Sequence, residues 1–210
     1  MLGIIKRDLI LIFSNKRERF FLIFYIPFLL FIVESYDPQF MYFVILVAYT
    51  YLLSIIPFAY DISGKTRYII NSLPINRKET VIYKYLSTFI YFAITIVYAG
   101  VYLWIINALK IKFVDYFNLE MIIKALPITI IFISIVFPAY FRFEPKIAQI
   151  FHMIVFIAFF ITITNISIVG EKSFVKYLSF LQGKNIAFLA IVMYIISLLL
   201  SIKLYENRDL

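Results

Sequence analysis

Three consecutive residues, Gly64, Lys65 and Thr66, have the residue types that end a phosphate-binding loop. In such a loop, backbone N–H groups hold the phosphates, the lysine reaches the terminal phosphates and the hydroxyl binds magnesium. The loop also requires a glycine five residues before Gly64 and a strand leading into it. That position is Ala59, and it lies at the end of an apolar stretch. The motif therefore fails, and we expect no nucleotide, cofactor or metal to be bound by this chain itself.

Other arrangements of reactive side chains are missing from the sequence. His152 is the single histidine and the chain has no cysteine, so a thiolate metal site or a disulfide cannot form. No His-Glu-x-x-His or Gly-x-Ser-x-Gly motif indicates a metallopeptidase or a serine hydrolase. Ionisable residues are rare in the middle of the apolar stretches, where ion-driven carriers usually keep a few. We expect no catalytic residue, and a driving force other than a coupling ion held in this chain.

The composition is that of a helical membrane protein. Apolar residues make up 64% of the 210 and charged residues 15%, whereas soluble domains are about 45–50% apolar and about 25% charged. Long apolar stretches separated by short polar clusters are typical of bundled transmembrane helices. The net charge of +8 is spread over the flanks of these stretches and is not gathered into one patch. We therefore expect the lipid bilayer, and no nucleic acid, as the partner of the basic residues.

Six apolar stretches come close to the roughly 20 residues that a helix needs to cross the hydrocarbon. They cover approximately residues 20–33, 40–60, 82–109, 121–140, 148–169 and 185–204. The first is short and contains Pro27, so we expect it to be kinked or to extend into the basic segment before it. The expected fold class is all-α, with six transmembrane helices in a single domain of residues 1–210.

Lysine and arginine predict the orientation, because basic flanks stay in the cytoplasm. With the N-terminus inside, 14 of the 20 basic residues lie in cytoplasmic segments and 6 lie in outer segments. The abundance of Ile, Lys, Phe, Tyr and Asn is typical of an AT-rich bacterial genome. We expect a multi-pass protein of a bacterial cytoplasmic membrane, with both termini in the cytoplasm.

The first 19 residues combine an apolar stripe with basic side chains. Leu2, Ile5, Leu9 and Ile12 follow one another at spacings of 3, 4 and 3, which places them on one helical face. Such a helix lies in the membrane interface with its apolar side toward the lipid. A simple positive flank of the first span is the alternative, but a flank would not need the stripe. We predict an interfacial in-plane helix over residues 1–19.

Residues 61–80 connect the second and third apolar stretches, and they are expected to form a short helix, a stop and a second helix start. Residues 67–73 carry apolar and basic side chains, and Pro74 disfavours helix at the residue before it. Asn76 is a favourable N-cap residue, and Glu79 completes a capping-box pair that starts the third span.

The run DISGKTRYIINSLPINRKETVIYKYL, residues 61–86, resembles the loop between the second and third spans of type-2 ABC exporter permeases. That loop reads as an acidic residue, a glycine, a short helix, then SLP, a basic restart and a lysine–aromatic entry into the next span. The amphipathic N-terminal segment, the six spans, the second basic loop PAYFRFEPKIAQ and the C-terminal SIKLYENRDL agree with it. The resemblance covers essentially the whole chain.

The resemblance implies a permease subunit that lacks its own ATPase. Two such permeases, identical or paired with a relative, sit on two separate ATPase subunits that bind ATP and magnesium. Short cytoplasmic coupling helices pass the closure of the ATPases to the spans. Carried onto this sequence, the main coupling helix lies within residues 65–73 and a second contact lies around residues 142–146. The residues implied to contact the ATPase are Lys65, Arg67, Tyr68, Leu73, Arg142 and Lys146.

Hydroxyl, amide and aromatic groups within the spans are candidates for a substrate path. Such a path suits an amphipathic or hydrophobic substrate, although the same side chains also serve helix packing and membrane interfaces. The candidate residues are Tyr49, Tyr51, Tyr98, Trp104 and Asn165.

Two classes of function remain open. The first is the permease subunit of an ATP-driven exporter that moves amphipathic peptides, such as toxins or antimicrobials, or hydrophobic compounds out of the cell. This small, ATPase-free form is similar to permeases of peptide-toxin and phenol-soluble-modulin exporters. The alternative is a non-transporting immunity or regulatory subunit of the membrane that binds a toxin or a partner complex. The two differ at residues 65–73, through which an exporter subunit must recruit its ATPase.

Overall fold

The computed structural model describes residues 2–32, 38–62, 76–169 and 184–207. These residues form helices and no strand. The helices are α1 (Leu2–Ser14), α2 (Lys16–Ile32), α3 (Pro38–Ile62), α5 (Arg77–Ala108), α6 (Leu119–Arg142), α7 (Pro145–Val169) and α9 (Lys184–Glu206). From α2 onward, each helix covers all or nearly all of one of the six apolar stretches. The helix α2 begins at Lys16, so the first stretch extends into the basic segment before it.

Four helices within the described ranges are long and apolar enough to cross a membrane. They are Pro38–Tyr60, Arg77–Ala108, Leu119–Arg142 and Asn185–Glu206. The helix α2 has 17 residues with Pro27 inside it, and the apolar part of α7 that was tested, Lys146–Thr162, is also shorter. The chain is therefore an all-α protein with several candidate spans, while the number six stays a prediction.

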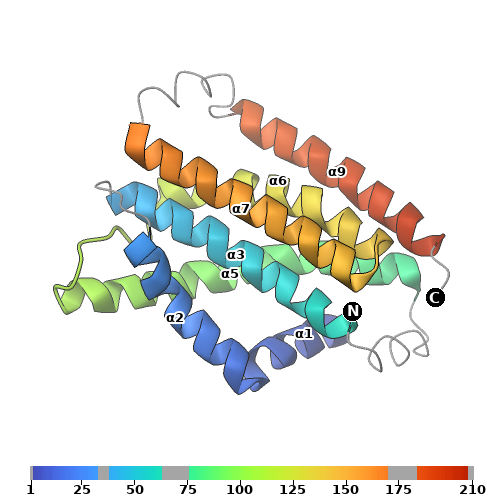
Figure 1. Cartoon of the computed structure of the whole chain (residues 1–210), viewed down its shortest axis with the longest axis horizontal. Coiled ribbons are helices and arrows are strands. Elements are labelled where there is room, and N and C mark those ends of the chain that lie inside the picture. The colour runs from blue at the N-terminus through green and yellow to red at the C-terminus, as the bar shows by residue number, and fades with distance from the viewer. Residues whose placement is uncertain (1, 33–37, 63–75, 170–183, 208–210) are drawn as a thin grey trace.

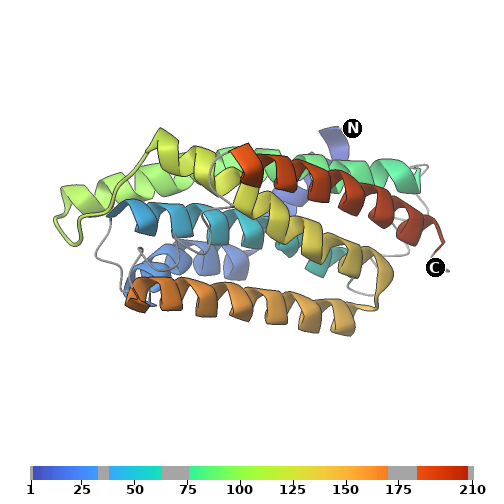
Figure 2. The same cartoon turned by 90° about the horizontal axis from the view of Figure 1, so that it is seen from above.

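The helix α3 lies at the centre of the bundle (Figure 1). Viewed from above, α5 and α9 form one side, α3 and α6 the middle, and α7 the other side (Figure 2). The helix α3 packs against α5 and α6, and α6 packs against α7 and α9. The apolar window of α3 is 83% buried, compared with 17% for that of α9. Protein thus encloses α3, whereas most of α9 is left to face lipid.

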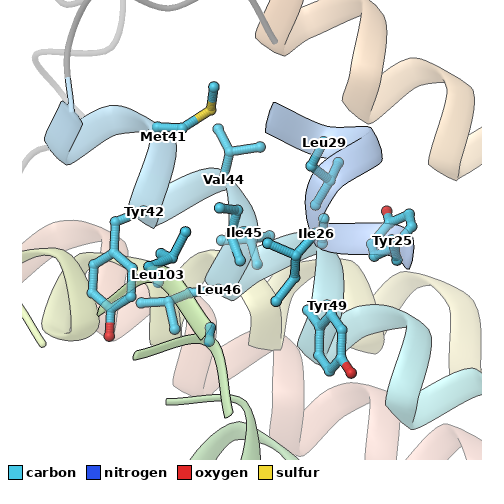
Figure 3. Close-up of a cluster of buried hydrophobic side chains, with 14 of the residues drawn as sticks. Tyr25, Ile26, Leu29, Met41, Tyr42, Val44, Ile45, Leu46, Tyr49 and Leu103 are labelled. Atoms are coloured by element: carbon cyan, nitrogen blue, oxygen red, sulfur yellow. The ribbon is translucent and has the colours of Figure 1, made fainter. Parts of the chain in front are cut away.

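Apolar side chains hold α2 against the central helix (Figure 3). Ile26 and Leu29 of α2 are fully buried, and so are Val44 and Ile45 of α3 and Leu103 of α5. In a bilayer, the lipid is as apolar as these side chains, so close van der Waals packing between them replaces the hydrophobic effect as the source of cohesion. This packing fixes the position of α2 even though α2 is short.

Two residues of the predicted stripe, Leu9 and Ile12, pack on the protein, which corrects the expectation that they face lipid. Ile12 is fully buried in the core, and Leu9 packs against the same core. The helix contacts α2, α3 and α5, whose apolar side chains compete successfully with lipid for this face. Ile10 and Phe13 of α1 are exposed instead, at 54% and 44%. Whether α1 lies in the plane of the membrane stays a prediction.

The connection from α5 to α6 folds back on the end of α5. The Asn107 side chain accepts from the N–H of Val114 at 3.0 Å and donates to its carbonyl at 2.6 Å. Asn118 caps α6 by accepting from the N–H groups of Glu120 and Met121. Phe117 adopts a positive φ of 53°, and its ring covers Gly100, where a Cβ atom would overlap the ring.

Gly100→Ala is expected to be less stable than Gly3→Ala by about 1 kcal/mol, because the added methyl group displaces the Phe117 ring, which is 46% exposed. Thermal unfolding in detergent micelles measures the effect. Gly3→Ala is the matched control, since a Cβ atom there meets nothing within 4 Å. Equal melting temperatures for the two variants would contradict the contact.

Candidate functional site

The residues implied to contact an ATPase fall at one end of the bundle or outside the described ranges. Lys65, Arg67, Tyr68 and Leu73 lie outside the described residues. Arg142 is the last residue of α6 and Lys146 lies in the first turn of α7, and both are exposed. The turn between α6 and α7 lies at the same end of the bundle as the start of α5 and the end of α9 (Figure 1).

The start of α5 is capped as the sequence predicts. The Asn76 side chain accepts from the N–H of Lys78 at 3.2 Å, and Asn76 has the extended backbone of an N-cap residue. Glu79 behaves differently from the predicted capping box, because its carboxylate accepts from the Tyr83 hydroxyl at 3.5 Å. The cap is confirmed at Asn76.

The first turn of α5 also contacts the C-terminal end of α9. Arg77 donates to the carbonyl of Glu206 at 3.0 Å and to that of Tyr205 at 3.4 Å. The Lys78 ammonium lies 3.4 Å from the Glu206 carboxylate. Carbonyls at the end of a helix lack partners within the helix and attract cations. The start of α5 and the end of α9 are therefore tied together.

Two turns further along α5, a buried ion pair joins α5 to α1. The Lys84 ammonium lies 2.7 Å from one carboxylate oxygen of Asp8, and the two side chains are 2% and 1% exposed. The other oxygen of Asp8 accepts from Nη2 of Arg7 at 2.7 Å and from Nε at 3.1 Å. The ammonium also lies 5.0 Å from the centre of the Phe58 ring of α3. Lys84 is one of the 14 basic residues counted in cytoplasmic segments, and the structure buries its side chain.

Tyr85, the next residue, ties α5 to α9. Its hydroxyl lies 2.6 Å from the Ser197 hydroxyl and 2.8 Å from that of Ser201. Ser197 in turn donates to the carbonyl of Ser134 on α6 at 2.6 Å. All four residues are buried. The N-terminal half of α5 is thus joined by polar contacts to α1 through Lys84 and to α9 through Tyr85. Ser197 extends the second set of contacts from α9 to α6.

Two of the candidate path residues come together between α3 and α5. The rings of Tyr49 and Tyr98 are stacked with centroids 5.2 Å apart, and the ring of Tyr102 follows at 6.0 Å from that of Tyr98. Tyr25 of α2 lies 6.2 Å from Tyr49 on the other side. These four rings, which we call the tyrosine ladder, lead from the buried core to a groove along α5.

The groove is a shallow, open and almost entirely apolar face lined by α5 alone, with a volume of about 880 Å³. Tyr98 and Tyr102 belong both to the groove and to the tyrosine ladder. The lining residues are Phe89, Ile90, Ala93, Ile94, Val97, Tyr98, Val101, Tyr102 and Ile105.

The other candidate path residues belong neither to the tyrosine ladder nor to the lining of the groove that the structure describes. The Tyr51 hydroxyl lies 2.7 Å from Nδ1 of His152, and the Tyr51 ring stacks on Phe156 with centroids 6.1 Å apart. These contacts join α3 to α7. Trp104 is 54% exposed on α5, and the side chain of Asn165 lies outside the described residues.

No cluster of three or more His, Asp or Glu side chains that could hold a metal ion occurs among the residues that the structure describes. The expectation that this chain binds no cofactor stays a prediction. The single histidine, His152, is held within the bundle by the Tyr51 hydroxyl.

Comparison with protein families identifies the chain. The family described as ABC-2 family transporter protein matches residues 3–206 of the 210. Since the match covers nearly the whole sequence, the chain belongs to this family of transporter membrane proteins. It is a multi-pass permease component of a family that usually works with an ATPase subunit. No curated protein and no solved structure matches the chain.

Proposed function

We propose that the chain is the permease subunit of an ATP-driven exporter, in which a separate ATPase supplies the energy. The observation that carries this proposal is the way the first turns of α5 are fastened. Residues 65–73, which resemble a coupling helix, precede α5 directly in the sequence. A displacement passed to Arg77 and Lys84 reaches α9 and α1 through their polar contacts. The end of the bundle that holds these contacts is the cytoplasmic end in this proposal.

The exported substrate in this proposal is an amphipathic peptide or a hydrophobic compound. The groove along α5 supports this choice, because an apolar lining with two tyrosine residues offers van der Waals contact and few polar groups. The tyrosine ladder connects the groove to the interior. Two copies of the ATPase and a second permease, identical or related, complete the exporter.

Charge reversal at the predicted ATPase contacts tests the proposal. Arg142→Glu with Lys146→Glu, and separately Arg67→Glu with Leu73→Glu, are expected to reduce recruitment of the ATPase by roughly tenfold or more. Like charges replace complementary ones at the three basic positions, and a charge replaces an apolar contact at Leu73. The measurement is ATP hydrolysis by the complex isolated from host membranes through a tag on this chain.

The matched control is Lys110→Glu with Lys124→Glu, which reverses two exposed basic residues at the opposite end of the bundle. ATP hydrolysis is expected to stay unchanged in this control. Recruitment that survives both reversals at the predicted contacts would favour the non-transporting immunity or regulatory subunit.

A further inference from the structure

The ion pair between Asp8 and Lys84 joins parts of the chain that are far apart in sequence. Both carboxylate oxygens of Asp8 are occupied, one by Lys84 and the other by Arg7. The Lys84 ammonium is additionally covered by the Phe58 ring. Three helices, α1, α3 and α5, therefore meet at the Lys84 ammonium group.

Stability alone is a weak reason for such an arrangement. Removing two charges from water costs several kcal/mol for each ion, and apolar side chains of similar size often stabilise a protein as well as a buried pair does. A buried pair does differ from apolar contacts in one respect. Short charge-assisted hydrogen bonds, at 2.7 Å here, have a preferred length and direction, whereas apolar contacts are non-directional.

The place of the pair indicates which geometry it fixes. Lys84 lies two turns after the start of α5, next to Tyr85, which contacts α9. About two turns earlier, Arg77 and Lys78 contact the end of α9. Asp8 is thus the point at which the N-terminal helix joins the segment of α5 that already carries the C-terminal helix.

We propose that Asp8 and Lys84 are positioning residues that make α1 move together with α5 during the transport cycle. This inference rests on the proposed function, since it assumes that a separate ATPase displaces the start of α5. It adds that α1 is part of the moving assembly. The N-terminal helix then carries its exposed Ile10 and Phe13 through the lipid with α5.

The test replaces both charges by apolar side chains. The variant Asp8→Leu with Lys84→Met removes the two charges and keeps the branching of the first side chain and nearly the length of the second, so its melting temperature is expected to stay within a few degrees of the wild-type value. Arg7, which is 31% exposed, can turn its guanidinium to water. ATP hydrolysis by the permease–ATPase complex is nevertheless expected to fall about tenfold, the size of a typical coupling between two sites.

A distance measurement separates positioning from folding. The chain has no cysteine, so spin labels attach only at cysteines introduced at Gly3 in α1 and at Leu86 in α5. A Cβ atom at Gly3 meets nothing within 4 Å, and Leu86 is 45% exposed. We expect one narrow distance distribution that is the same with and without trapped nucleotide. In Asp8→Leu with Lys84→Met, we expect a broad distribution.

The matched control removes another ion pair from the same protein. Glu120 and Lys124 are 2.6 Å apart, and their side chains are 64% and 57% exposed. Glu120→Leu with Lys124→Met is expected to change neither ATP hydrolysis nor the distance distribution, because an exposed pair of this kind contributes little.

The outcomes distinguish a failure of the positioning role from a failure of the proposed function. Full ATP hydrolysis or an unchanged narrow distribution in Asp8→Leu with Lys84→Met overturns the positioning role and leaves the proposed function intact. A wild-type chain that recruits no ATPase overturns the proposed function, and the positioning role in transport fails with it.

Discussion

Asp8→Leu alone is expected to be among the most damaging single changes in the protein, with a loss of about 3–5 kcal/mol of stability. The reason is that Lys84, at 2% exposure, keeps a buried charge without its carboxylate. Lys84→Met is expected to cost less, because Asp8 retains the guanidinium of Arg7 on its other oxygen. The two changes together are expected to cost less than Asp8→Leu alone.

Thermal unfolding in the same detergent of the wild type, the two single variants and the double variant measures this double-mutant cycle. The coupling energy is the difference between the effect of the double variant and the sum of the single effects. An additive result would mean that the two charges do not interact, and it would contradict the contact. A Lys84→Met variant that is less stable than Asp8→Leu would contradict the compensating role of Arg7.

Tyr85→Ala is expected to produce the second large loss, also about 3–5 kcal/mol, through an unfilled cavity. The Tyr85 ring is 1% exposed and meets the rings of Phe137 and Tyr194 edge to face, with centroids 5.0 Å and 5.3 Å away. Tyr85→Phe keeps these ring contacts and removes only the hydroxyl. Its cost is expected to be about 1–3 kcal/mol, because the Ser197 and Ser201 hydroxyls lose a buried partner.

The comparison of the two variants separates packing from hydrogen bonding at the junction of α5 and α9. Thermal unfolding is again the measurement, and Leu86→Ala serves as a control because Leu86 follows Tyr85 on α5 but is 45% exposed. Equal losses for Tyr85→Ala and Tyr85→Phe would mean that the hydroxyl, and not the ring, holds the junction.

The helices could be located from the sequence because their signals are local. An apolar stretch near the length of the hydrocarbon, ended by asparagine or proline, defines a membrane helix without knowledge of its neighbours. The start of α5 is a good example, since Asn76 caps it as expected. The start of α2 was harder to place, because Lys16, Arg19 and the residues between them do not resemble a span.

The contacts between helices could not be found in the same way. Asp8 and Lys84 are 76 residues apart, and nothing near either residue indicates its partner. The stripe of α1 shows the limit of periodicity as well. The spacing of Leu9 and Ile12 correctly places them on one face, but periodicity does not tell whether lipid or protein covers that face. The structure shows protein there.

The candidate path was predicted from residue type, and the structure divides it. Tyr49 and Tyr98 stack on each other, whereas Tyr51 turns to His152 on α7. These two tyrosines of α3 are two positions apart, which places them on different sides of a helix. A single sequence shows that spacing but not which helix lies on each side.

The enclosure of α3 has a consequence for biosynthesis. This helix is synthesised before α5 and α6, which cover it in the finished protein. Until they are inserted, the hydroxyl groups of Thr50 and Ser54, both buried in the bundle, lack the cover that these two helices provide. The Ser54 hydroxyl has a hydrogen-bond partner within α3, since it donates to the carbonyl of Thr50 at 2.8 Å. The newly made helix therefore carries part of its polar contacts with it into the bilayer, before its neighbours arrive.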